Sequence, residues 1–210
     1  MYIPHYFKNK NLDEVKEFLS RNSFGILINS IDSKLWATHI PLELEKNKEG
    51  QDVLVGHISK TNPQWKNFTK NEEVLAIFQG PNSYISSTWY KDENVPTWNY
   101  IAVHVYGKVK TIEGDELLES LKKLVDKYEK DSANPVSVDR MSKETLKQIN
   151  GIVAFEIIIH EIQAAYKLSQ NRNEDDYNNI INKLQNRNNP NSKMIAKEMI
   201  KIKVSNPFQK

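Results

Sequence analysis

One stretch indicates the fold of this 210-residue chain most clearly: Trp98-Asn-Tyr-Ile-Ala-Val-His-Val-Tyr-Gly-Lys-Val-Lys-Thr-Ile112. Apolar residues alternate in it with aromatic and basic ones, and this period of two is typical of a β-strand with one buried face. A strand of this length usually bends around a barrel, and Gly107 is a suitable position for the bend or bulge. The stretch therefore predicts a long, curved strand.

Shorter apolar runs bounded by Gly, Asn, Asp or Pro lie on both sides of this strand, and each predicts a further strand. These runs cover residues 24–29, 35–42, 52–58, 73–79 and 151–162. Their connections are short, which favours antiparallel pairing, because parallel strands need crossovers of about a dozen residues. The sequence thus predicts a mainly β fold with six or seven antiparallel strands.

Apolar residues at helical spacing predict helices around the sheet. These helices cover residues 12–21, 62–69, 115–128 and 141–149, with a loop around Pro135 before the last of them. The tail is rich in Asn and Lys and predicts two more helices, separated by residues 188–191. We therefore expect a barrel domain over residues 1–172 and a C-terminal helical appendage over 173–210, packed on the barrel or on a dimer.

The composition excludes several classes of function. The chain has no cysteine, which rules out disulfides, thiolate nucleophiles and zinc sites with Cys ligands. Its net charge of +2 gives no broadly basic face for nucleic acid, so any DNA contact would be local. No apolar run approaches the roughly 18 residues of a membrane span, and residues 1–10 contain no apolar signal segment. We expect a cytoplasmic protein without membrane contact.

Polar residues on the strands or just beyond their ends are candidates for a ligand site. They are Thr38, His39, His57, Ser59, Lys60, Lys66, Gln79, Trp98, Asn99 and His104. His57 and Ser59 share one side of an extended strand, and Lys66 would follow on a helix, an arrangement that can bind a phosphate. An ordinary solvated barrel edge carries the same residue types and is the alternative. The five histidines form no motif for metal binding, and no Walker loop, nucleophile elbow or dinucleotide fingerprint occurs.

Three further patterns allow more than one interpretation. An aromatic band predicts a core seam, a dimer contact or a platform for a flat ligand, and it consists of Tyr84, Trp89, Tyr90, Trp98, Tyr100 and Tyr106. Carboxylates on alternating strand positions indicate a solvated outer face rather than an acid/base pair, and these are Glu43, Glu45 and Glu156. Lysines of the tail favour a solvated helix face over a DNA-binding one, and these are Lys193, Lys197, Lys201 and Lys203.

Six segments occur in a characteristic order: MYIP (1–4), ATHIPL (37–42), GHISKTNPQWK (56–66), FQGPNSYIS (78–86), VPTWNYIAVHVYG (95–107) and KLSQNR (167–172). Together they resemble the PaiB family of FMN-binding negative transcriptional regulators. The resemblance implies an antiparallel Greek-key split β-barrel of the pyridoxamine-phosphate-oxidase type. It also implies a homodimer in which FMN lies in the groove between the two subunits.

The resemblance also implies roles at the FMN site. On the phosphate side it implies His57, Ser59 and Lys66, with Gln79 and Gly80 reaching the ribityl chain or the phosphate. At the isoalloxazine ring it implies the backbone of Thr38, His39 and Ile40, with Trp98 and Asn99 supplied by the partner subunit. Arg172 lies in a segment loosely similar to the one that places an Arg near the substrate of the oxidases. The oxidase histidine is missing there, which argues against pyridoxamine phosphate oxidation.

Three functions follow as alternatives. The family resemblance implies a regulator that lowers transcription of genes for sporulation and degradative enzymes, acting on DNA directly or through a protein partner. The second alternative is a flavin-dependent oxidoreductase that acts on a small molecule with NAD(P)H as the electron donor. The third is a haem-binding or haem-degrading split-barrel protein, in which His39 or His104 would ligate iron. No residue is identified as an acid or base, because a flavin would carry the electron transfer itself.

Overall fold

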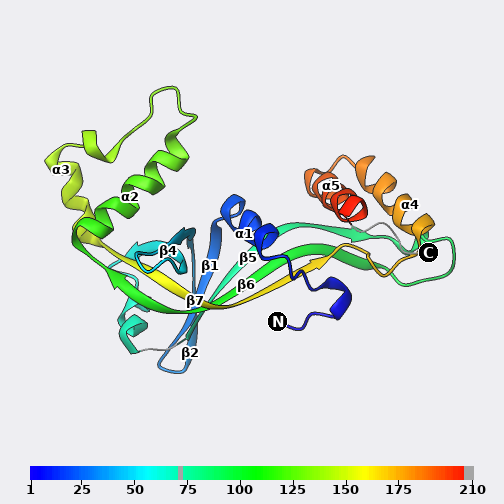
Figure 1. Cartoon of the computed structure of the whole chain (residues 1–210), viewed down its shortest axis with the longest axis horizontal. Coiled ribbons are helices and arrows are strands. Elements are labelled where there is room, and N and C mark those ends of the chain that lie inside the picture. Colours follow the sequence, from blue (N-terminus) through cyan, green and yellow to red (C-terminus); the bar gives the residue numbers. More distant parts are fainter. Residues whose placement is uncertain (71–72, 206–210) are drawn as a thin grey trace. The chain divides into compact units, whose positions relative to one another are not determined.

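The computed structural model describes residues 1–70 and 73–205 (Figure 1). The strands are β1 (Phe24–Ile31), β2 (Lys34–Pro41), β3 (Glu43–Lys46), β4 (Asp52–Ser59), β5 (Glu73–Ile85), β6 (Thr97–Ile112) and β7 (Ile152–Lys167). The α-helices are α1 (Leu12–Arg21), α2 (Gly114–Glu129), α3 (Lys143–Leu146), α4 (Glu174–Gln185) and α5 (Pro190–Ser205). The 3-10 helices are η1 (His5–Phe7), η2 (Pro63–Lys70), η3 (Ser87–Trp89), η4 (Val138–Arg140) and η5 (Lys147–Gly151). Residues 206–210 of the expected appendage lie outside the described part.

The strands form one seven-stranded sheet in the order β2-β1-β5-β6-β7-β4-β3. The ladders of β1 with β2 and β5, and of β4 with β3 and β7, are antiparallel. Strands β2 and β4 are not neighbours in this order, yet they contact each other, as expected of a barrel that is split rather than closed. The prediction of a mainly β, antiparallel fold with peripheral helices is confirmed.

Strands β1 and β2 form a hairpin whose turn has only two residues, Asp32 and Ser33. Both have positive φ angles, of 49° and 66°. Two left-handed residues in succession give the turn whose twist matches that of the flanking strands. The hairpin register pairs Leu27 with Thr38 and Ile26 with His39, and thereby fixes the position of the first predicted site residues.

Gly107 allows the middle of β6 to approach β7 closely. A Cβ atom at this position would lie 2.5 Å from both Ile157 Cγ2 and the Ile158 carbonyl oxygen. Any larger residue would therefore push the two strands apart. Gly56 allows β4 to approach residues 41–42 closely, because a Cβ atom there would lie 2.9 Å from Leu42 Cδ2.

The structure corrects some strand boundaries. Strand β5 continues beyond Gln79 to Ile85, and β7 continues beyond Ile162 to Lys167. Strand β3, which is highly charged, was not expected as a separate strand. Within the described chain, no helix combines the length and the apolar character needed to cross a membrane.

The chain divides into two compact units, and β5, β6 and β7 contribute residues to both. Unit 1 comprises Met1–Val15, Gln79–Val103 and Gln163–Lys210, and unit 2 comprises Lys16–Phe78 and His104–Ile162. In unit 1, helices α4 and α5 pack against each other, as their orange and red ribbons show in Figure 1. Ser192 of α5 hydrogen-bonds Ser83 of β5 at 2.9 Å. The expected C-terminal appendage therefore packs on the strands of its own unit.

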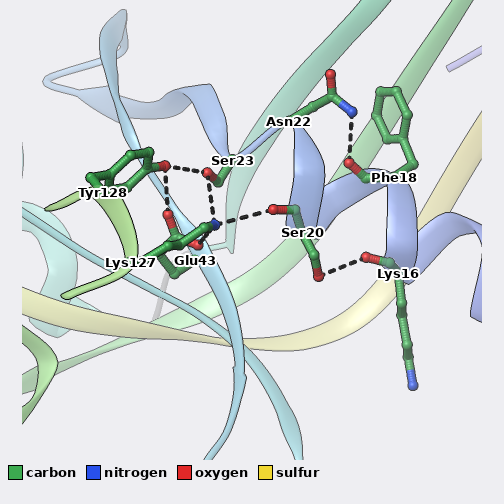
Figure 2. Close-up of polar contacts among 8 residues, drawn as sticks. All are labelled: Lys16, Phe18, Ser20, Asn22, Ser23, Glu43, Lys127 and Tyr128. Carbon is green, nitrogen blue, oxygen red and sulfur yellow. Dashed lines mark hydrogen bonds and ion pairs between the residues drawn. The ribbon is translucent and has the colours of Figure 1, made fainter. Parts of the chain in front are cut away.

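A polar network ties helix α2 to the rest of unit 2 (Figure 2). Lys127 of α2 donates to the Ser20 carbonyl oxygen of α1 at 3.1 Å and forms an ion pair with Glu43 of β3. Tyr128 donates its hydroxyl proton to Glu43 at 2.8 Å and lies 2.6 Å from the hydroxyl of Ser23, which is buried. The network joins the end of α1, the start of β1 and the β2–β3 corner to one helix.

Candidate functional site

The helix η2 is fastened to strands β1 and β2 by one fully buried side chain. Gln64 is 0 % exposed, and its Nε2 donates to the Leu27 carbonyl oxygen at 3.0 Å. Its Oε1 accepts a hydrogen bond from the Thr38 hydroxyl, and its own carbonyl oxygen accepts one from Asn29 at 3.3 Å. Burial of an amide is favourable only when its polar atoms are bonded, as they are here. Gln64 thereby fixes the position of η2 over the β1–β2 hairpin.

Asn62 completes the connection between β4 and η2. Its Oδ1 accepts from the Gln64 backbone N–H at 3.0 Å, which starts the helix, and its Nδ2 donates to the Thr38 hydroxyl at 2.9 Å. The structure thus brings the predicted residue Thr38 to the segment 59–66, which carries Ser59 and Lys66. Asn62 and Gln64 were not among the predicted site residues; their place in the segment 56–66, on either side of Pro63, was the available signal.

The segment that follows β4 exposes hydroxyl groups and cations. The Ser59 and Thr61 hydroxyls lie 2.8 Å apart, and the Thr61 N–H donates to Ser59 Oγ at 3.2 Å. Lys60 and Lys66 are exposed, and neither has an ion-pair partner among residues 1–70 and 73–205. Two hydroxyls and two ammonium groups within residues 59–66 can bind an anion such as a phosphate.

His57 lies two residues before Ser59 on β4, opposite Ala154 of β7. It is half-buried, and this burial lowers its pKa. The imidazole is therefore neutral at pH 7, so it would serve a phosphate as a hydrogen-bond donor and not as a charge. His104 on β6 is also half-buried with a lowered pKa caused by burial, and its Nδ1 has no hydrogen-bond partner in the part of the chain described.

Strand β2 lies at one end of the sheet order, so only one of its sides is engaged in a ladder. His39 is exposed on this strand, whereas Ile40 is 8 % exposed and belongs to the core. An edge strand offers backbone N–H and C=O groups to a ligand or to another chain. The predicted backbone contacts of Thr38, His39 and Ile40 with a flavin ring require such an edge.

The other predicted site residues belong to unit 1. Gln79 is exposed and Gly80 half-buried on β5. Trp98 is 53 % exposed on β6 and packs edge-on against Tyr84, with the ring centroids 5.9 Å apart. Within the aromatic band, Tyr90 by contrast is buried in the core.

Asn99, the neighbour of Trp98, is fully buried. Its Nδ2 donates to Ser169 Oγ at 2.9 Å, and its Oδ1 accepts from the same hydroxyl at 3.1 Å. Its Nδ2 also lies 3.6 Å from Met199 Sδ of α5. The side chain thus anchors the turn after β7 and helix α5, and its role at a cofactor stays a prediction.

Arg172 lies just beyond β7 and stacks on an aromatic ring. Its Cζ is 4.5 Å from the centroid of Tyr90, and its backbone N–H donates to the Ser169 carbonyl oxygen at 3.0 Å. Lys167, in the same sequence segment, donates to Thr97 Oγ1 at 2.6 Å.

The interpretation of the strand carboxylates as a solvated outer face is wrong. Glu156 is 3 % exposed and pairs with Lys110 at 3.1 Å. Glu45 pairs with Lys123 of α2 at 2.7 Å, and Glu43 belongs to the network of Figure 2. Glu43 and Glu45 are held by side chains of α2, and Glu156 is buried, which strand periodicity alone does not reveal. A cavity of about 390 Å³ beside α2 is lined by Glu45, Lys123 and Glu156 and contains none of the predicted site residues.

Over the described residues, no group of three or more His, Asp or Glu side chains is arranged to hold a metal ion. The groups found at β2, β4 and η2 are hydroxyls, ammonium groups, an imidazole and the backbone of an edge strand. Groups of these kinds can bind and orient a ligand.

Comparisons with known proteins agree with this description. Residues 1–161 match the model of the family described as "Putative FMN-binding domain". The chain is 52 % identical over 200 residues to "Protease synthase and sporulation protein PAI 2" of Bacillus subtilis. The aligned region covers 95 % of this chain and 96 % of that protein.

Two solved structures share the fold. One is the FAD and heme binding protein of Mycobacterium smegmatis, with a TM-score of 0.61, 13 % identity, and coverage of 81 % of this chain and 78 % of that one. The other is the flavocytochrome Anf3 of Azotobacter vinelandii, with a TM-score of 0.60 and 16 % identity. The match covers 83 % of this chain and 76 % of that one. At these identities the likeness concerns the fold alone.

Proposed function

Because this chain belongs to the PaiB family of FMN-binding proteins, we propose that it binds FMN and acts as a flavin-dependent negative regulator of gene expression. The observation that carries the proposal is the exposed set of hydroxyls and lysines from the end of β4 to η2, whose lysines have no ion-pair partner in the part of the chain that the structure describes. A bound flavin would supply electron transfer. The protein would supply the binding and the orientation.

The donor set fits the phosphate of FMN. Ser59 and Thr61 donate hydroxyl protons, and Lys66 adds a positive charge that no carboxylate of the described chain neutralises. The neutral His57 donates a ring N–H without adding charge. The proposal assigns the phosphate to these groups, with Lys66 reaching it from η2, which Gln64 attaches to β1 and β2.

The fit also extends to the flavin ring. Strand β2 lies at one end of the sheet order, and the Thr38 hydroxyl is hydrogen-bonded to Asn62 and Gln64 of the segment that carries Ser59 and Lys66. A flavin ring carries N–H and C=O groups along one edge that pair with backbone groups in the manner of a neighbouring strand. Residues 38–40 would therefore orient the ring through their backbone.

The proposal includes a homodimer that completes the site. Trp98 and Tyr84 expose a pair of aromatic rings in unit 1, and exposed aromatic pairs are typical of protein interfaces and of platforms for flat ligands. In the proposed dimer, Trp98 forms a wall of the partner's flavin groove. Gln79 and Gly80 would reach the ribityl chain or the phosphate.

The regulatory part of the proposal rests on the relative from Bacillus subtilis, whose name refers to protease synthesis and sporulation. The similarity covers 95 % of this chain and 96 % of that protein. The net charge of +2 gives little electrostatic attraction to DNA. Two of the tail lysines are also engaged, since Lys201 pairs with Glu198 and Lys203 with Glu174. We therefore favour regulation through the flavin state and a protein partner.

The test is a titration of the purified, flavin-free protein with FMN, FAD and riboflavin, followed by flavin fluorescence and visible absorption. Saturable binding of one FMN per subunit, tighter than that of riboflavin, is expected. Binding of riboflavin as tightly as FMN would contradict the phosphate site. If the FMN-bound protein is retained on target DNA and the retention weakens with salt, direct regulation is supported. If NADPH bleaches the absorption of the bound flavin, an oxidoreductase is favoured.

A further inference from the structure

The cavity of about 390 Å³ beside α2, which lies within unit 2, is lined by more carboxylates than lysines. Asp115 and Glu119 of α2 line it and form no ion pair with any described residue. The lysines that line it are all engaged in ion pairs of 2.7 to 3.8 Å: Lys46 with Asp52, Lys48 with Glu116, and Lys123 with Glu45. The cavity therefore has an excess of negative charge.

A second, independent observation is the buried carboxylate in the cavity wall. Glu156 of β7 is 3 % exposed and lines the cavity next to Val55, its partner in the β4–β7 ladder. Its Oε1 accepts from Lys110 at 3.1 Å, whereas its Oε2 accepts no hydrogen bond from the described residues. Buried polar atoms are normally bonded, because an unmade bond leaves the cost of desolvation. A donor that enters the cavity would satisfy Oε2.

The stability of the fold does not require a carboxylate at this position. The side chain of Lys110 is 54 % exposed, so the partner of Glu156 could remain in water without it. An apolar residue of similar volume in place of a buried charge is often neutral or stabilising, because no desolvation has to be offset. A ligand that binds Glu156 would account for the buried charge.

The other walls of the cavity are apolar or offer a further acceptor. Val53, Val55 and Ile112 supply aliphatic surface. The Ser120 hydroxyl donates its proton to the Leu117 carbonyl oxygen at 2.7 Å, which leaves its oxygen free to accept. Among the described residues, no group of three or more His, Asp or Glu side chains is arranged to hold a metal ion. The walls thus suit a charged N–H group on an apolar chain.

We propose that this cavity binds a primary alkylammonium ion, with the ammonium group at Glu156 and Ser120 and the chain against Val53 and Val55. An ammonium group has three donors that point in different directions, which suits acceptors from separate elements better than a planar guanidinium does. The volume lies within the range of about 300 to 1,000 Å³ that is typical of small-molecule sites. The proposal does not rest on flavin binding, because no residue predicted for the flavin lines the cavity.

The experiment measures binding of n-butylammonium to the purified protein by calorimetry at pH 7.5 and low ionic strength. Saturable binding of one ion per chain is expected. n-Butanol has the chain without the charge, and Mg²⁺ has charge without the chain. Both should bind at least roughly tenfold more weakly, the usual worth of a hydrogen bond to a charged group. Equal binding of n-butanol would reduce the site to an apolar cavity, and tighter binding of Mg²⁺ would make it a metal site. Either result, or no binding of n-butylammonium, would overturn the proposal.

Three variants locate the site. Glu156→Leu should weaken n-butylammonium binding roughly tenfold or more and leave the melting temperature unchanged or higher. Glu119→Gln should weaken binding roughly two- to fivefold, as for an exposed charge. Since Glu119 is exposed, this variant tests the site even if Glu156→Leu does not fold.

Asp126→Asn is the matched control. Asp126 is exposed on the same helix but does not line the cavity, so its replacement removes an equal charge outside the site. Affinity for n-butylammonium should be unchanged in this variant. Wild-type affinity in a folded Glu156→Leu variant, or the same loss in Asp126→Asn as in Glu119→Gln, would contradict the assignment.

Discussion

Lys110 Nζ lies 3.1 Å from Oε1 of Glu156, and the two partners differ sharply in exposure. The Glu156 side chain is 4 % exposed, whereas that of Lys110 is 54 % exposed. A buried carboxylate is thus neutralised by a cation that reaches it from solvent. Removal of the lysine would leave a largely buried charge without its partner.

We predict that Lys110→Met destabilises the protein by roughly 1 to 2 kcal/mol. This is less than the loss for a fully buried pair, because Lys110 is screened by solvent. Glu156→Gln should cost less than Lys110→Met, since it removes the buried charge and keeps an acceptor. Urea denaturation at pH 7.5 measures both. An equal or larger loss in Glu156→Gln would contradict this account.

The same pair predicts a dependence on alkaline pH. The hydrogen bond to Glu156 raises the pKa of Lys110 above its ordinary value. The contribution of the pair is therefore fully present below about pH 10.5 and is lost as the pH rises through the folded-state pKa. The stability difference between wild type and Lys110→Met should be constant from pH 7 to 9 and shrink at higher pH.

Gln64 is predicted to be the most sensitive polar residue of the connection between β4 and η2. Gln64→Leu keeps the volume but leaves the Leu27 carbonyl oxygen without its donor and the Thr38 hydroxyl without its acceptor. We expect a loss of roughly 1 to 3 kcal/mol for these unsatisfied groups. We also expect weaker FMN binding, because η2 carries Lys66. Gln148→Leu, at an exposed position of the same unit, is the control and should change neither quantity.

His57 is predicted to make the protein less stable in mild acid. Because burial lowers its pKa, the unfolded chain takes up a proton below about pH 6.5 while the folded protein does not. Stability is therefore lost as the pH falls through this range. His57→Asn should lose less stability between pH 7.5 and 5.5 than wild type, as measured by chemical denaturation. His5→Asn, at an exposed position, should behave as wild type; a His57→Asn profile parallel to wild type would remove His57 as the cause.

The sequence predicted best those helices and strands in which the spacing of apolar residues shows that one face is buried. Helix α1 begins and ends where expected, at Leu12 and Arg21, and β6 differs by a single residue at its start. Strand β5 was predicted too short because Gly80 and Pro81 are strand breakers, although they are tolerated in this strand. Strand β7 was predicted too short because Ala164 and Ala165 have low β propensity, yet both are buried.

The candidate site was predictable only in part, for a physical reason. Strand alternation places His57 and Ser59 on one side, and the structure keeps both on β4. The attachment of Thr38 to Asn62 and Gln64 depends on a tertiary contact between a hairpin and a 3-10 helix, which no local period encodes. The burial of Glu156 likewise depends on an interaction that only the folded chain brings together.

Lys66 provides the sharpest test of the FMN site. It is exposed on η2 without an ion-pair partner in the described chain, so its replacement removes a cation without leaving a buried group unpaired. Lys66→Ala should weaken FMN binding by roughly 1.5 to 3 kcal/mol, the usual worth of a hydrogen bond to a charged group. Riboflavin binding should be unchanged, because riboflavin has no phosphate. Lys108→Ala, an exposed lysine on β6, is the matched control and should bind both flavins as wild type does. An equal loss for FMN and riboflavin would mean that Lys66 acts on the ring or on the fold, and an unchanged FMN titration would remove it from the site.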